Sequence, residues 1–93
     1  MSQAPEPVHL NNDHRNTVTR IFQHPASHNI EWREVVSLLE AVGSVRPHRD
    51  NKVEVSVGTE TRFFDVPDGK DVPIETVVAL RLLLAAGGFE PAG

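Results

Sequence analysis

Residues 52–66 constrain the fold more than any other stretch of this chain. Residues 52–57 alternate between polar side chains and valine, which predicts a strand with one buried and one solvated face. Gly58 and Thr59 are typical of a tight turn, and the β-branched and aromatic residues of 60–66 predict a second strand. The stretch is therefore expected to form a β-hairpin.

One further strand and two helices are predicted around the hairpin. Residues 44–46 form a short candidate strand, and Pro47 indicates that this strand lies at a sheet edge or ends there. Residues 31–43 and 73–87 carry apolar residues at helical spacing, so each segment is expected to bury one face. The stripes are Val35, Leu38, Leu39 and Val42 in the first segment, and Val77, Leu80, Leu83 and Leu84 in the second.

The ends of these helices carry recognisable signals. Glu31 is the expected N-cap of the first helix, and Glu34 lies close to the positive end of the helix dipole. Gly43 is expected to end that helix in the left-handed conformation. Pro73 suits the first position of the last helix, and the paired glycines at 87–88 are expected to end it.

The amino-terminal third is predicted to have two parts. Residues 1–11 offer little apolar surface against the entropy of ordering, so they are expected to be a disordered tail. Residues 12–29 are expected to form a helix and the turn after it. The helix runs from Asn12 to Gln23, is capped by Asn12 or Asp13, and carries Val18, Ile21 and Phe22 on one apolar stripe. Residues 30–90 then make up the main domain. The expected fold class is α+β: a three-stranded antiparallel sheet with two helices packed on one face, plus an extra amino-terminal helix.

Composition excludes several classes of protein. The chain has no cysteine, so a disulfide framework, a thiolate zinc site and a cysteine nucleophile are excluded. Its net charge of −4 disfavours broad binding to nucleic acid, which depends on a basic face. Neither an apolar run of transmembrane length nor the pattern of a signal peptide is present, so a cytoplasmic location without membrane contact is expected.

Metal sites and common catalytic motifs are not indicated. The histidines near the amino terminus stand in no zinc motif. They are His9, His14, His24 and His28. Asp65, Asp68 and Asp71 lack the spacing of a calcium loop and are interpreted as a solvated acidic loop. No phosphate-binding glycine loop, no Gly-x-Ser-x-Gly elbow and no serine with a plausible histidine partner is recognised, so no cofactor is expected.

The stretch from Trp32 to Gly88 runs through a helix ending at Gly43, three strands, and a Lys70-Asp71 approach to a leucine-rich last helix. This layout resembles the small HicA toxins of bacterial toxin–antitoxin systems. The resemblance implies a fold similar to the double-stranded-RNA-binding domain and a bacterial or phage source. HicA toxins cleave mRNA without the ribosome, using one histidine in a Gly-Ser-His pattern at the start of the middle strand. The matching stretch here, residues 50–54, contains no histidine.

His48 is the nearest histidine to that position, and it lies in the most basic stretch of the chain, residues 46–52. In one hypothesis the chain is an mRNA interferase or an RNA-binding protein. His48 is then the candidate catalytic residue, and Arg46, Arg49 and Lys52 contact the RNA backbone with it. The alternative interpretation is a solvated loop whose charges keep the edge strand from pairing with other chains.

A second function class follows from the last helix. Val78, Leu82 and Ala85 lie away from its buried stripe, so either the amino-terminal helix or another protein is expected to cover them. The favoured hypothesis is a non-catalytic, HicA-like module that binds a host protein or an antitoxin through Val78, Leu82 and Trp32. Trp32 has a second interpretation, in which it covers one edge of the core. A homodimer through this helix is the alternative to a foreign partner.

Overall fold

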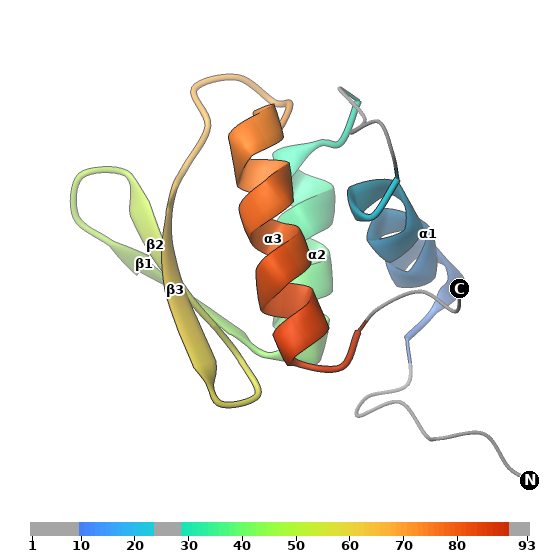
Figure 1. Ribbon diagram of the computed structural model, residues 1–93. Coiled ribbons are helices and arrows are strands. Elements are labelled where there is room, and N and C mark those ends of the chain that lie inside the picture. Colours follow the sequence, from blue (N-terminus) through green and yellow to red (C-terminus); the bar gives the residue numbers. More distant parts are fainter. Residues whose placement is uncertain (1–9, 24–28, 90–93) are drawn as a thin grey trace, which may run out of the picture.

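The computed structural model describes residues 10–23 and 29–89, and it has the α+β fold expected from the sequence. Its elements, in chain order, are α1 (Asn12–Ile21), α2 (Trp32–Val42), β1 (Ser44–His48), β2 (Lys52–Val57), β3 (Glu60–Asp65) and α3 (Ile74–Ala86). Figure 1 shows three layers: the sheet, a middle layer formed by α2 and α3, and α1 on the outside. The middle layer covers one face of the sheet and leaves the other face open.

The sheet has the strand order β1-β2-β3, and both strand pairs are antiparallel. Val53, Val55 and Val57 of β2 are buried, as the alternation predicts, while Lys52 is exposed. Gly58 begins the two-residue turn with a φ of +61°, a conformation that L side chains rarely adopt. The predicted hairpin is therefore confirmed.

Pro47 lies inside β1, opposite Val53, and the strand continues to His48. The sequence left open whether Pro47 ends the strand or marks an edge, and the structure places it in an edge strand. Because β1 has a neighbour on one side only, the missing N–H of a proline can be tolerated there. The third strand ends at Asp65, one residue before the predicted end.

α2 begins as predicted and ends for a different reason. Glu31 is the N-cap, and its backbone N–H donates to Glu34 Oε1 at 3.3 Å as one arm of a capping box. Gly43 has a φ of −166°, so the predicted left-handed conformation is wrong. A Cβ at this position would lie 1.8 Å from the carbonyl oxygen of Ser56. Glycine is needed here because β2 passes very close to the junction between α2 and β1.

α3 buries the face that the sequence predicts. Its fully buried residues are Val77, Leu80, Leu83 and Leu84. Pro73 is the N-cap of this helix rather than its first helical residue, since its ψ of 154° is extended. Gly87 caps the far end, and Gly88 follows with a φ of +88°, so the paired glycines end the helix as expected.

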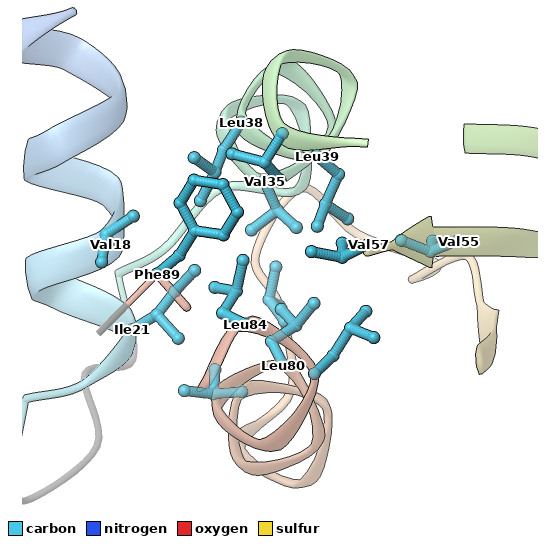
Figure 2. Packing of buried hydrophobic residues seen from close by; sticks show 14 of the residues in the cluster. Val18, Ile21, Val35, Leu38, Leu39, Val55, Val57, Leu80, Leu84 and Phe89 are labelled. Atoms are coloured by element: carbon cyan, nitrogen blue, oxygen red, sulfur yellow. The ribbon is translucent and has the colours of Figure 1, made fainter. Parts of the chain in front are cut away.

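One apolar cluster connects the three layers (Figure 2). Leu80 and Leu84 point from α3 toward Val57 of β2 and the facing side chains of α2. Ile21 points from α1 toward the same cluster, beside Phe89. Core side chains of this kind supply most of the stability of a small domain, so α1 is tied to the rest of the fold mainly through this contact.

α1 starts at Asn12, as predicted, but its N-cap is the preceding residue. The side chain of Asn11 accepts a hydrogen bond from the backbone N–H of His14 at 2.8 Å. The helix ends at Ile21, two residues before the predicted end. Leu10 is only 4% exposed and packs in the core. The folded part of the chain therefore includes residues that the sequence assigned to the tail.

The remainder of the predicted tail, residues 1–9, lies outside the described residues, as do residues 24–28 of the predicted turn and residues 90–93. His9, His24 and His28 fall in these ranges. Across the ranges that are described, none of the helices combines the length and the apolar character needed to cross a membrane.

Candidate functional surfaces

The open face of the sheet brings together most of the residues predicted to bind RNA. Neighbouring residues on paired antiparallel strands project from the same face, so the strand registers define which side chains meet there. Three rows cross this face: Ser44, Ser56 and Thr61; Arg46, Glu54 and Phe63; His48, Lys52 and Asp65. Three of the four predicted basic residues therefore share one surface, and they share it with two carboxylates.

His48 contacts two neighbours on this face. Its Nε2 lies 2.9 Å from Glu54 Oε1, and its ring meets Phe63 edge-on with the ring centroids 5.3 Å apart. The side chains of His48 and Glu54 are 45% and 24% exposed, so solvent reaches the pair. A histidine bonded to a carboxylate has the components of a general acid–base pair. An exposed phenylalanine beside it offers a surface on which a base could stack.

The cations of the open face are balanced by carboxylates. Lys52 Nζ lies 2.6 Å from Asp65 Oδ1. This hydrogen bond, together with the negative charge of Asp65, raises the pKa of Lys52 above its ordinary value of 10.5. Glu54 lies directly opposite Arg46 on the neighbouring strand, just as Asp65 lies opposite Lys52. The face is consequently a mixture of both signs rather than the basic patch that the sequence suggested.

The fourth predicted basic residue, Arg49, lies off this face, in the turn between β1 and β2. Asp50 and Asn51 complete the turn with φ values of +62° and +59°. Aspartate and asparagine tolerate this left-handed conformation better than other non-glycine residues, which explains why the hairpin turns here. Arg49 is exposed at the end of the hairpin, apart from the rows of the sheet.

The second candidate surface lies on α3. The large hydrophobic side chains that are exposed within the described residues are Phe63, Val78 and Leu82, at 59%, 43% and 68%. Val78 and Leu82 are one helical turn apart, on the side of α3 away from its buried stripe. α1 also contacts α3, but it leaves these two side chains uncovered. Val78 and Leu82 are called the α3 strip below.

The chain around the start of α3 has more acidic than basic side chains, with Lys70 as the exposed cation between two aspartates. Asp68 and Asp71 are exposed in the segment that leads into the helix, and Glu75 is exposed in its first turn. Aspartate and glutamate are favourable there because the N-terminal end of a helix carries partial positive charge. A partner that covered the α3 strip would meet these carboxylates at one end of the contact.

Trp32, the third residue predicted to bind a partner, is half-buried and packs against the core. Its backbone N–H donates to the carbonyl oxygen of Lys70 at 2.7 Å, and the N–H of Val72 donates to Ile30 at 2.8 Å. These bonds join the start of α2 to the segment before α3. The packing of Trp32 fits the interpretation in which it covers an edge of the core.

A polar groove of about 460 Å³ runs between α1 and α2. In it His14 Nε2 lies 2.9 Å from Ser37 Oγ, so the chain does contain a serine with a histidine partner, contrary to the sequence analysis. The two residues are 23 positions apart and meet only because α1 folds over α2. Ser37 lies in the middle of α2 rather than on the strained turn that exposes a nucleophilic serine. The pair is therefore interpreted as an interhelical hydrogen bond.

No cluster of three or more histidine, aspartate or glutamate side chains in residues 10–23 and 29–89 could hold a metal ion.

Comparison of the chain with protein-family models, curated proteins and solved structures finds no match. The function therefore has to be inferred from the two surfaces themselves.

Proposed function

We propose that this chain is a non-catalytic, HicA-like module of bacterial or phage origin that binds a partner protein through the α3 strip. The observation that carries the proposal is the exposure of Val78 and Leu82, at 43% and 68%, on a helix whose opposite face is completely buried. Large aliphatic side chains that stay exposed next to each other are a common mark of a protein-binding surface. The strip is small, so we expect a contact that continues onto neighbouring residues.

The absence of a catalytic role is supported by the resemblance and by the charges. The stretch that matches the HicA histidine motif, residues 50–54, has no histidine. Lys52 is bonded to Asp65, so one of the cations that would stabilise a phosphodiester transition state is already paired. A net charge of −4 further weakens attraction to RNA.

Charge also indicates the chemistry of the partner. Asp68, Asp71 and Glu75 lie at the end of α3 that precedes the strip, and all three are exposed. A complementary surface therefore has an apolar centre with basic residues at one edge. Host proteins and antitoxins with such a surface are the candidates.

The test is affinity capture from a bacterial lysate on the purified wild-type chain and three variants. Leu82→Asp places a charge in the strip. Thr59→Asp places the same charge in the exposed hairpin turn as a matched control, and His48→Ala removes the candidate catalytic residue. We expect a protein that is retained by wild type, Thr59→Asp and His48→Ala but lost from Leu82→Asp. Circular dichroism of each variant establishes that the fold is intact. Equal retention on all four proteins would contradict the choice of surface.

A second candidate function has its own observation in favour of it. The open sheet face holds His48 and Glu54 at 2.9 Å, with Arg46 in the adjacent row and Phe63 against the histidine ring. These are the groups that a ribonuclease or an RNA-binding protein needs: an acid–base pair, a cation and a stacking surface. On this hypothesis the chain binds or cleaves single-stranded RNA on the open face.

RNA binding and cleavage at low salt would test the second candidate, because weak phosphate contacts are strongest there. Wild type is compared with His48→Ala and Phe63→Ala, both at exposed positions. Cleavage that is lost in His48→Ala, or binding that is lost in Phe63→Ala, would support the RNA function over the protein-binding function. If wild type neither cleaves nor binds RNA, the RNA function is excluded.

A further inference from the structure

α1 forms a separate layer of the molecule. It packs on α2 and α3 but on no strand, and Figure 1 shows it on the outside of these helices. The sheet with α2 and α3 would form a complete two-layer arrangement without it. α1 is therefore an addition to the framework of the domain.

The sequence of α1 provides little helix stability by itself. Of its ten residues, Arg15 and Arg20 alone belong to the strong helix formers. Isolated helices shorter than about 12–15 residues are marginal in water. We therefore expect α1 to be helical only while it is docked, and to open more readily than the core.

The helix itself makes few apolar contacts, although Leu10 before it and Phe22 after it also pack in the core. Val18 and Ile21 are 5% and 0% exposed, and Figure 2 shows both on the side of α1 that faces Phe89. They are three residues apart, so they form one short stripe. Beside this stripe lies the polar groove between α1 and α2, which is open to solvent.

The polar contacts that hold α1 in place are ones that another helix could also make. Arg81 of α3 donates from Nε to the carbonyl oxygen of Ile21 at 2.7 Å and from Nη2 to that of Gln23 at 2.6 Å. The last carbonyls of any helix lack partners within the helix, so Arg81 binds a helix end rather than a particular side chain. Arg20 adds an ion pair to Glu34 of α2 at 3.2 Å.

We propose that the face of α2, α3 and Phe89 beneath α1 is a helix-binding site, which α1 occupies in the free protein and from which an amphipathic helix of a partner protein displaces it. The contacts define the partner helix. It has two aliphatic residues three positions apart, a basic residue that meets Glu34, and free carbonyls at its C-terminal end for Arg81. This site is distinct from the α3 strip, and its test uses neither Val78 nor Leu82.

α1 then acts as an intramolecular competitor. A partner binds only the fraction of molecules in which α1 is undocked, so its apparent affinity falls in proportion to that fraction. Weakening α1 without altering the site beneath it should therefore strengthen binding of a helix added in trans.

The test uses full-length proteins and a fluorescein-labelled peptide of residues 10–23 as the probe. Ile21→Ala removes the most buried side chain of α1, whereas Thr19→Ala changes an exposed residue of the same helix. We expect the peptide to bind Ile21→Ala at least ~10-fold more tightly than it binds wild type or Thr19→Ala, by fluorescence anisotropy. Arg20→Gln, which loses the contacts of Arg20 to Glu34 and to the carbonyl oxygen of Asn29, should lie between them.

Amide hydrogen exchange gives a second readout on the wild-type protein. The amides of α1 should exchange faster than those of β2, because α1 opens without global unfolding. Equal protection of α1 and β2 would overturn the proposal, as would a folded Ile21→Ala or Arg20→Gln that binds the peptide no better than wild type. A wild-type dimer that disappears in Ile21→Ala would make a second copy the occupant and would also overturn it.

Discussion

Leu82 and Leu84 form a matched pair on α3 that tests whether the strip is open. Leu84 is fully buried, so Leu84→Ala should cost about 2–5 kcal/mol of unfolding free energy. Leu82 is 68% exposed. Full burial of a leucine side chain is worth ~1.5–3 kcal/mol, and Leu82 has about a third of its surface covered, so Leu82→Ala should cost at most ~1 kcal/mol.

The assay is urea unfolding followed by circular dichroism and Trp32 fluorescence, at two protein concentrations that differ by about tenfold. In a domain of this size the Leu84→Ala loss corresponds to a fall in Tm of roughly 8–40 °C, against at most roughly 4–8 °C for Leu82→Ala. A loss above ~2 kcal/mol in Leu82→Ala would refute the reasoning. A wild-type midpoint that rises with protein concentration would show that the chain self-associates, and loss of that dependence in Leu82→Ala would place the α3 strip in the contact.

Three further predictions follow from single contacts. Gly43→Ala should destabilise the fold by at least ~1–3 kcal/mol in urea unfolding, because its Cβ would lie 1.8 Å from a backbone oxygen of β2; unchanged stability would contradict the close approach. Asn11→Ala should lower the unfolding free energy by ~1 kcal/mol through loss of the N-cap of α1, and a thermal unfolding curve identical to that of wild type would argue that the cap is not formed in solution. The pKa of Lys52 is raised by Asp65, so the stabilisation from this pair is present below pH 10.5 and is lost as the pH rises through the folded-state pKa; an NMR titration should find the shift in wild type and not in Asp65→Asn.

Local signals in the sequence predicted local structure correctly. Glu31 caps α2 as expected, because the signals for a helix start lie within a few residues of each other; the capping box with Glu34 is an addition from the structure. The alternation of residues 52–57 placed the valines in the core for a similar reason, since side-chain direction in a strand depends only on parity. Gly43 shows where this reasoning stops. The residue was correctly identified as the end of α2. Glycine is required there because the backbone of Ser56, distant in sequence, lies close in space.

The sequence predicted the α3 strip better than the open sheet face, because the strip depends on local spacing and the sheet face depends on contacts between distant residues. Val78 and Leu82 were found from the sequence, because helical periodicity alone separates them from the buried stripe of α3. The pairing of His48 with Glu54 was missed, since it requires the register between β1 and β2 and a strand that runs through Pro47. With that register, Arg46, His48 and Lys52 lie on a sheet face that also carries Glu54 and Asp65, whereas Arg49 lies in the turn.

The contact between His14 and Ser37 was also missed, because it depends on how α1 packs over α2. The sequence offered only its apolar stripe as a signal that this helix docks, and Arg81 of α3 gave no sign that it would bind the end of α1. Contacts of this kind need the tertiary arrangement, and they carry the inference that α1 occupies a helix-binding site.

Site-specific photocrosslinking tests the central claim most directly. A photoreactive amino acid is introduced at Leu82 and, as a control, at Thr59, which is exposed on a different part of the surface. Both proteins are irradiated in bacterial lysate. The account predicts a discrete protein adduct from position 82 that is absent from position 59. No adduct at position 82, or the same adducts at both positions, would contradict the proposal that the α3 strip binds a partner protein.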